Sequence, residues 1–191
     1  MSIGAVFILN ILFARFYGAG ESGRVFYLFT VYSFLIQLVS FSLESGVGYY
    51  AAKRSIPGSR LLGFSLTWSV LATLVVAVLF IPAARLISGG LNYPLSYPVA
   101  YILGCMLISF GNSFCYSIYR FVLPNLVSVL VNGLLILFLL FQYFFLPGLD
   151  FISLYFYSFL FHGALLLVSV TVIEQNLHVS FRFYTGGIRD I

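Results

Sequence analysis

The sequence predicts an all-α protein, a polytopic membrane bundle of six transmembrane helices. The first observation is composition, because only 7% of the 191 residues are charged and 62% are hydrophobic. Soluble domains carry about 25% charged residues, and a soluble protein of this size could not cover its surface with so few. The second observation is that the apolar residues form long runs. The third is that short segments rich in glycine and proline separate these runs.

Six runs are predicted to cross a bilayer, for which a helix needs about 20 mostly apolar residues. They are residues 1–16, 25–44 (with 45–50 as an optional extension), 61–81, 97–119, 126–146 and 151–173. At 1.5 Å per residue the first run extends only about 24 Å, less than a hydrocarbon core of about 30 Å. We therefore expect either that this helix is tilted little or that the chain lacks residues at its start.

The connectors between the runs have the composition of turns. They are 17–23, 55–59, 88–94, Pro124–Asn125 and Pro147–Gly148. Because all of them are short, consecutive helices should be antiparallel neighbours. None is long enough to form a soluble domain.

The distribution of Lys and Arg predicts the orientation. The second and fourth connectors and the C-terminal tail hold six of these residues: Lys53, Arg54, Arg60, Arg120, Arg182 and Arg189. The other connectors hold three: Arg15, Arg24 and Arg85. Cytoplasmic loops of membrane proteins are enriched in Lys and Arg, so we expect both termini in the cytoplasm.

Polar side chains recur at helical spacing inside the predicted spans. In the second span they fall within about 80° of arc on one helix, and they are Thr30, Ser33, Gln37, Ser40 and Glu44. The fourth span carries Tyr101, Cys105, Ser109, Asn112, Tyr116 and Arg120, and the sixth carries Tyr155, Ser158, His162 and Ser169. Lipid cannot form hydrogen bonds with these groups, so the stripes must face protein or water.

Two interpretations of the stripes stay open. Small and hydroxylated residues let helices pack closely and bond to one another, which suffices for the third and fifth spans. A hydrated cavity is favoured for the second and fourth spans, because Gln37, Glu44, Asn112 and Arg120 are large or charged.

Several charged or titratable residues are candidates for a role in transport. Glu44 and His162 are candidates for coupling to a cation or a proton. The alternatives are an interfacial ion pair for Glu44 and a simple bond between helices for His162. Arg15 and Arg24 would attract phosphate if they faced inward, or lipid head groups if they faced outward.

Other classes of protein are disfavoured. The basic residues are scattered singly and form no patch for a nucleic-acid backbone. Cys105 and Cys115 lack a His or Cys partner at metal-ligand spacing and are interpreted as small hydrophobic residues. There is no H-E-x-x-H, G-x-S-x-G or phosphate-loop motif, and the five acidic residues are unpaired in the sequence. We therefore expect no enzyme activity, no cofactor and no resident metal.

Residues 14–54 contain a distinctive arrangement of motifs. An apolar helix ends in Ala14-Arg15 and is followed by A-R-F-Y-G-A-G over 14–20, a short acidic turn and a second apolar helix. That helix ends in L-E-S-G over 43–46, and Y-Y-A-A-K-R follows at 49–54. The stretch resembles the amino-terminal part of the lipid-linked oligosaccharide flippases of the Wzx class. These flippases belong with lipid II flippases and MATE drug exporters in the MOP superfamily.

The resemblance implies one half of a two-bundle transporter. In that family two bundles of six spans enclose a cavity that opens to either side in turn, and cationic groups receive the pyrophosphate of a lipid carrier. Residues 1–173 would then form one bundle. Residues 174–191 would form a cytoplasmic tail or a linker to a second bundle, supplied by a longer chain or by another copy.

The implied function is transport of an undecaprenyl-pyrophosphate-linked oligosaccharide across the bacterial inner membrane for polysaccharide or lipopolysaccharide biosynthesis. Residues expected to contact the substrate are Arg15, Arg24, Gln37, Tyr101, Asn112, Tyr116, Arg120 and Tyr155. Expected partners are the lipid-linked saccharide and membrane lipids, with polysaccharide polymerase and glycosyltransferases as candidates and no nucleic acid. The alternatives are a MATE-like exporter of amphipathic small molecules and a non-transporting membrane scaffold.

Overall fold

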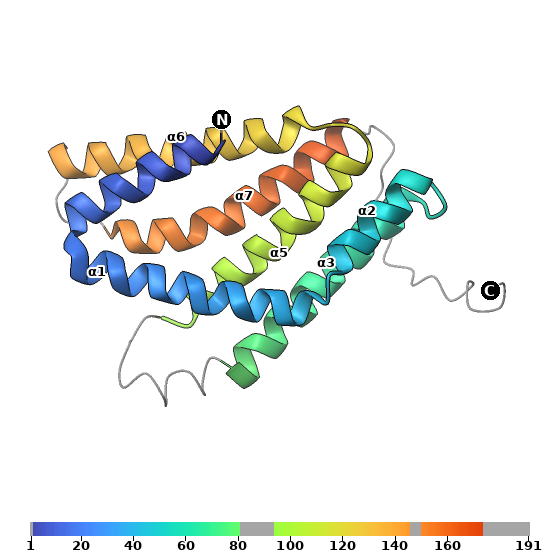
Figure 1. The fold of residues 1–191 in the computed structure, drawn as a ribbon, viewed down its shortest axis with the longest axis horizontal. Helices are drawn as coiled ribbons and strands as arrows, with labels where there is room; N and C mark the ends of the chain where they lie inside the picture. Colours follow the sequence, from blue (N-terminus) through green and yellow to red (C-terminus); the bar gives the residue numbers. More distant parts are fainter. Residues whose placement is uncertain (1, 81–93, 146–149, 174–191) are drawn as a thin grey trace.

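The computed structural model describes residues 2–80, 94–145 and 150–173, and this part of the chain is helical apart from short turns (Figure 1). The helices are α1 (Ser2–Ser40), α2 (Leu43–Lys53), α3 (Gly58–Val75), α5 (Ser96–Ser117), α6 (Val122–Phe145) and α7 (Phe151–Ile173). A π-helical segment, η1 (Val76–Phe80), extends α3. The predicted tail 174–191, with Arg182 and Arg189, and most of the third connector, with Arg85, lie outside the described residues.

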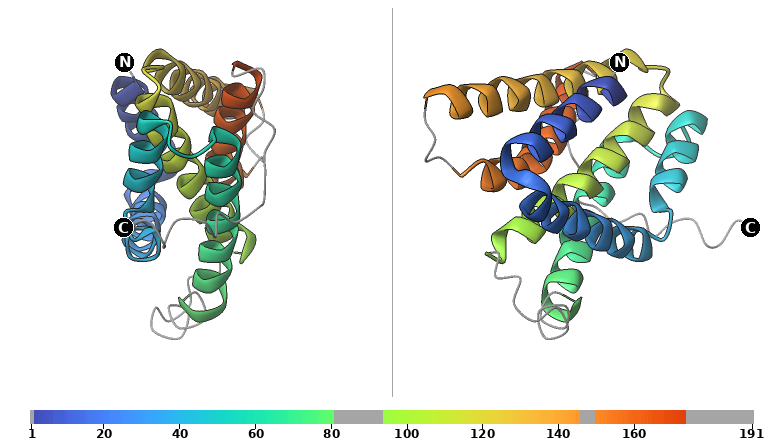
Figure 2. Two further views of the ribbon diagram at one scale, coloured as in Figure 1. Left: turned by 90° about the vertical axis from the view of Figure 1, so that its right-hand side faces the viewer. Right: turned by 60° about the vertical axis from the view of Figure 1, so that its left-hand side comes forward.

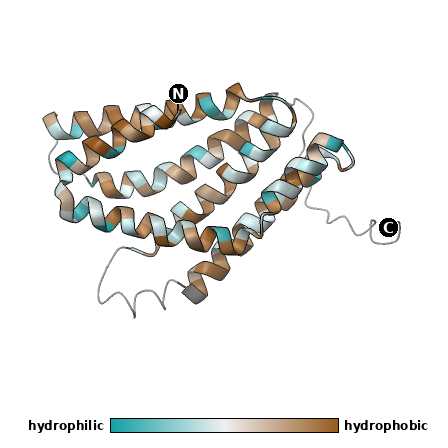
Figure 3. Cartoon of the chain, viewed as in Figure 1, coloured by the Kyte–Doolittle hydropathy of each residue, from teal (hydrophilic) through white to brown (hydrophobic). Residues whose placement is uncertain are grey.

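Five of the described helices are long and apolar enough to cross a membrane, namely α1, α3, α5, α6 and α7. Large apolar side chains cover their outer faces, as Ile3, Val122 and Val172 illustrate with exposed fractions of 83%, 75% and 66%. Figure 3 shows that hydrophobic residues predominate along these helices and that isolated hydrophilic residues interrupt them. Such a surface suits hydrocarbon and not water. The chain is therefore a multi-pass membrane protein.

The first two predicted spans are joined in α1, which has two arms that meet at Gly18. Gly18 has φ 76° and ψ 168°, a conformation that a helix cannot contain and that glycine alone adopts readily. The chain turns sharply there, and the arms form a V in Figures 1 and 2. The predicted connector over 17–23 was therefore too long, because Gly18 alone redirects the chain and the residues around it are helical. Ser22 Oγ donates a hydrogen bond of 2.6 Å to the Gly18 carbonyl oxygen just after the kink.

The optional extension of the second span to residue 50 was also wrong. Phe41 and Ser42 both have left-handed backbone conformations, with φ of 48° and 55°. Two such residues end α1, and α2 begins at Leu43 as a separate helix. Glu44 therefore lies on a different helix from the rest of the predicted polar stripe.

Helix α5 is the centre of the bundle and packs against every other α-helix, most extensively against α7. The closest approach is at Gly104, where a Cβ atom would collide with the main chain of Phe159 and Leu160 on α7. Gly163 on α7 is matched to this site, since a Cβ there would lie 2.9 Å from the Gly104 carbonyl oxygen. These two glycines let the α5 and α7 backbones come into contact, as small residues do in membrane helix pairs.

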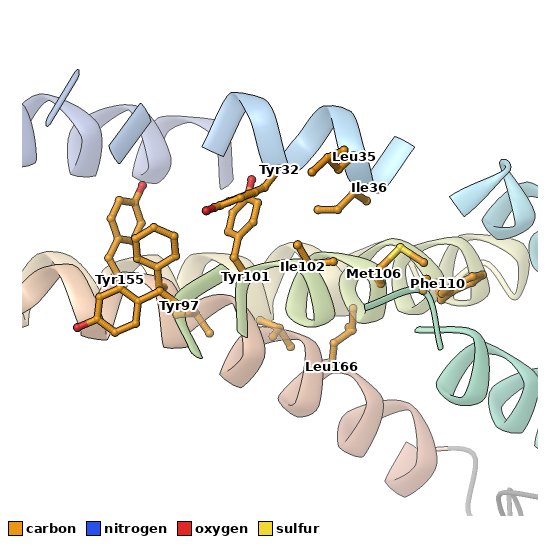
Figure 4. Packing of buried hydrophobic residues seen from close by; sticks show 14 of the residues in the cluster. Tyr32, Leu35, Ile36, Tyr97, Tyr101, Ile102, Met106, Phe110, Tyr155 and Leu166 are labelled. Atoms are coloured by element: carbon orange, nitrogen blue, oxygen red, sulfur yellow. The ribbon is translucent and has the colours of Figure 1, made fainter. Parts of the chain in front are cut away.

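The core along α5 is apolar at one end and aromatic at the other (Figure 4). Ile102, Met106 and Phe110 of α5 are almost fully buried, together with Leu166 of α7. Toward the start of α5, aromatic rings from α1, α5 and α7 pack edge to face. This packing places Tyr101 and Tyr155 of the predicted stripes inside the aromatic core.

Candidate functional site

The junction of α1 with α2 places Glu44 against α5. Glu44 lies in the first turn of α2, and its main-chain oxygen accepts a hydrogen bond of 2.5 Å from Ser113 Oγ on α5. Its side chain is half-buried, and the carboxylate oxygen Oε2 is buried with no hydrogen-bond partner in the part of the chain that is described. Burying a carboxylate oxygen without a hydrogen-bond donor costs free energy. Binding of a proton or a cation to Glu44 would remove this cost.

The predicted stripe on the second arm of α1 divides into two edges. Ser33 and Ser40 face the protein: Ser33 Oγ lies 2.8 Å from the hydroxyl of Tyr101, and Ser40 is buried. Thr30 and Gln37 are exposed on the outer edge. Each pair is seven residues apart, almost two full turns, so the helix presents two parallel polar rows.

The stripe on α5 changes character along its length. Tyr101 is buried, and its ring stacks on Phe29 with centroids 4.7 Å apart. Asn112 is half-buried, and Tyr116 and Arg120 are exposed at the end of the helix. The exposed members of this stripe, Tyr116 and Arg120, are therefore its last two.

The polar residues of α7 lie mostly within the bundle. Tyr155 is buried, and its hydroxyl donates to Asn10 Oδ1 on the first arm of α1 at 2.9 Å. His162 is half-buried, and its Nε2 atom is buried with no hydrogen-bond partner among the described residues. The structure therefore gives His162, like Glu44, one polar atom that packing leaves unsatisfied.

The two arginines near the α1 kink are both exposed. Arg24 Nη1 forms an ion pair with Glu21 Oε1 at 2.8 Å, and Arg15 lies one turn before Gly18. Arg24 is thus partly neutralised, and it lies at the opposite end of the bundle from Arg120.

The ten candidate residues do not converge on one point. Tyr101 and Tyr155 belong to the aromatic core, where Phe29, Phe13 and Phe159 cover their rings. Glu44 and Asn112 come closest to sharing a site, because Ser113, the neighbour of Asn112, bonds to the backbone of Glu44. The remaining six are distributed over α1, α5, α7 and the turn between α5 and α6: Arg15, Arg24, Gln37, Tyr116, His162 and Arg120.

Three polar contacts join helices at positions that sequence reasoning did not single out. Gln142 Nε2 donates to the Tyr17 hydroxyl at 3.1 Å, and Trp68 Nε1 donates to the Val39 main-chain oxygen at 3.2 Å. Tyr97 donates to Asp150 Oδ2 at 2.7 Å. The sequence offered a signal only for Asp150, which precedes an apolar run by one residue as a helix cap does, and whose Oδ1 accepts from the Ser153 amide.

No family model, curated protein or solved structure matches this chain. Among the described residues there is also no group of three or more His, Cys, Asp or Glu side chains that could hold a metal ion.

Proposed function

We propose that this chain is part of a transporter that moves a lipid-linked oligosaccharide across the bacterial inner membrane. In this proposal both arms of α1 cross the bilayer, so that the chain supplies six crossings and forms one half of a two-bundle, MOP-type transporter. The second bundle would come from a longer chain or another copy. Both termini of the bundle would lie in the cytoplasm.

The observation that carries the proposal is the outer polar edge of α1, formed by Thr30 and Gln37. Thr30 Oγ1 bonds within its own helix to the Phe26 carbonyl oxygen at 2.9 Å. The Gln37 side chain forms no hydrogen bond with any other residue in the described ranges, and it is exposed on the surface of this chain. Leaving an amide unpaired in hydrocarbon costs roughly 2–7 kcal/mol, so water in a cavity beside α1 is the favourable environment for it.

Glu44 supports the proposal because its buried carboxylate oxygen has no donor. A proton or a monovalent cation would satisfy this oxygen. Release of that proton or cation would change the charge at the junction of α1 with α2. Glu44 is therefore our choice for coupling transport to a cation gradient, and His162 is the second candidate.

The remaining candidates divide according to their exposure. Asn112 and Gln37 would bond sugar hydroxyls, and the exposed ring of Tyr116 would stack on a sugar face. The exposed arginines Arg15, Arg24 and Arg120 would contact phosphate or saccharide. Tyr101 and Tyr155 would shape the cavity wall, because their own rings are already packed.

One observation supports the alternative, which is a non-transporting scaffold. The inner polar edge of α1 is satisfied by protein, since Ser33 bonds to Tyr101. Tyr155 bonds to Asn10 in the same way. If Gln37 also met protein or lipid and never water, the stripes would be packing faces only.

Cysteine accessibility tests the cavity directly. Gln37→Cys and Leu38→Cys place thiols at the same depth on faces of α1 about 100° apart, and both native side chains are exposed. In a background with Cys105 and Cys115 replaced by Ala, we expect a membrane-impermeant thiol reagent to label position 37 and not position 38. Equal labelling, or no labelling at 37, would reject the cavity.

A cellular assay tests the substrate and the coupling residue. Glu44→Gln in the complete gene should abolish surface polysaccharide at unchanged expression. Glu21→Gln is the matched control, because the half-buried Glu21 forms an ion pair with Arg24 and has no proposed role in coupling. Loss of drug resistance with normal polysaccharide would favour the exporter, and normal values for both would reject the role of Glu44.

A further inference from the structure

Helices α2 and α5 end side by side and carry basic residues at that end. Ser113 of α5 faces both Glu44 and Gly48 of α2, since a Cβ on Gly48 would lie 2.5 Å from Ser113 Oγ. Both helices run in the same direction (Figures 1 and 2). Lys53 lies five residues after Gly48, about 7.5 Å further along α2, and so reaches the level of the α5 C-terminus. We call Lys53, Arg54 and Arg120 the basic rim.

Two left-handed turns fix the backbone from which these side chains extend. Arg54 caps α2 with φ 54°, and its amide donates to the Ala51 carbonyl oxygen. Tyr119 has φ 61°, and the amide of the next residue, Arg120, donates to the Cys115 carbonyl oxygen at 2.8 Å. Both turns are helix C-terminal caps, so they fix the local backbone from which Arg54 and Arg120 extend.

The basic rim has little acidic compensation. All three of its side chains are exposed. Among the described residues the one acid at this end is Glu44, which lies nine residues before Lys53, about 13 Å along the helix axis.

The opposite end of the bundle is different in charge. There the described arginines Arg15 and Arg24 are offset by Glu21 and Asp150, and Arg24 and Glu21 form an ion pair. Within the described ranges, positive charge is therefore less compensated at the basic rim than at the opposite end.

Exposed aromatic side chains surround the basic rim. Tyr49, Tyr119 and Phe121 have exposed fractions of 59%, 83% and 52%. Lys53 Nζ lies 5.8 Å from the centre of the Tyr49 ring. Tyrosine concentrates at the depth of lipid head groups, so these rings place the three cations at the same depth.

We propose that the basic rim binds the phosphodiester head groups of anionic membrane phospholipids. Guanidinium groups bond two phosphate oxygens at once, and a juxtamembrane cluster of Lys and Arg is attracted to an anionic bilayer surface. Three cations on two adjacent helix ends can hold a head group between α2 and α5. The bound lipid would thereby stabilise the contact of the short α2 helix with the bundle. This inference does not depend on the transported substrate.

Thermal unfolding of the purified full chain in detergent tests the proposal. Trp68 is the single tryptophan and contacts α1 through Val39, so its fluorescence reports unfolding. We expect phosphatidylglycerol in mixed micelles to raise the midpoint by about 2–4 °C over phosphatidylcholine. The double variant Lys53→Gln/Arg54→Gln should lose this rise, whereas Lys53→Arg/Arg54→Lys should keep it.

Charge-matched controls and a soluble anion decide the remaining outcomes. Arg15→Gln/Arg24→Gln removes two charges at the opposite end and should keep the full rise. Equal stabilisation by both lipids, or equal loss in this control, would overturn the proposal. An equal rise with soluble pyrophosphate and no lipid would assign the site to free phosphate and overturn the lipid as its occupant.

Discussion

The hydroxyl of Ser113 on α5 donates a 2.5 Å hydrogen bond to the main-chain oxygen of Glu44, 69 residues earlier on α2. This contact forms one turn from Gly48, whose missing side chain leaves the space that Ser113 Oγ occupies. The pair fixes a helix of only 11 residues to the centre of the bundle. The same hydrogen bond holds the backbone from which the Glu44 carboxylate extends. The placement of the proposed coupling residue therefore depends on Ser113.

Gly48→Ala should destabilise the protein through Ser113. The new Cβ would lie 2.5 Å from Ser113 Oγ, which must rotate away and lose its bond to Glu44. A hydrogen bond between membrane helices contributes about 0.6–1.7 kcal/mol, and we expect a loss of that size. Unfolding in mixed micelles with increasing SDS, followed by Trp68 fluorescence, measures it.

The double variant Gly48→Ala/Ser113→Ala supplies the control for this prediction. Removing the hydroxyl makes room for the Cβ, so the second substitution should cost less in the presence of the first. We expect a coupling energy of up to about 1.7 kcal/mol between the two positions, the full cost of Gly48→Ala alone. Strictly additive costs would show that Gly48 and Ser113 do not compete for the same space.

The long helices could be predicted from sequence because continuous apolar runs determine them. The predicted spans 97–119, 126–146 and 151–173 are observed as α5, α6 and α7 with shifts of at most four residues at their ends. The span 61–81 is observed as α3 with η1. The break after Ser40 was missed because its two left-handed residues are Phe41 and Ser42. Neither is glycine or proline, and the tertiary contacts of α2 with α5 overcome their local preference.

The candidate site could be predicted only in part. The predicted stripe included Glu44, which lies on α2, and its other four members span the boundary between the core and the surface of α1. Sequence spacing alone could not tell that Ser33 faces Tyr101 while Gln37 is exposed. The partner of Tyr155 was equally inaccessible, since Asn10 lies 145 residues away and on a different helix.

Gly18→Ala should destabilise the protein or straighten α1. The backbone at Gly18 has φ 76° and ψ 168°, where a Cβ is strained although no neighbouring atom lies within 4 Å. We expect a cost of about 1–3 kcal/mol in the same SDS titration. Gly20→Ala is the matched control, because Gly20 is helical and also has open space around it. That variant should be neutral or more stable by up to about 1 kcal/mol, and equal effects at the two positions would contradict the kink.

Gly104→Ala should be among the most damaging methyl additions in the chain. Its Cβ would meet the main chain of Phe159 and Leu160, which cannot rotate away as a side chain can. We expect at least about 1–3 kcal/mol of destabilisation and a lower yield of monodisperse protein by size-exclusion chromatography. Gly133→Ala on α6 has nothing within 4 Å and should not lower the yield. A tolerated alanine at 104 would mean that α5 and α7 lie further apart than the structure places them.

The orientation predicted from Lys and Arg can be tested with two exposed serines at opposite ends of the bundle. Ser55 lies in the turn between α2 and α3, beside the basic rim, and Ser96 begins α5 at the other end. Because positively charged loops are retained in the cytoplasm, we expect Ser96→Cys to react with an impermeant maleimide on intact cells. Ser55→Cys should react only after permeabilisation, and the experiment again requires Cys105 and Cys115 to be replaced by Ala. The reverse pattern would place the basic rim outside the cell, where the strongest positive charge of the described chain would face away from the cytoplasmic leaflet and its anionic lipids. In that case the expected cytoplasmic location of both termini would also be wrong.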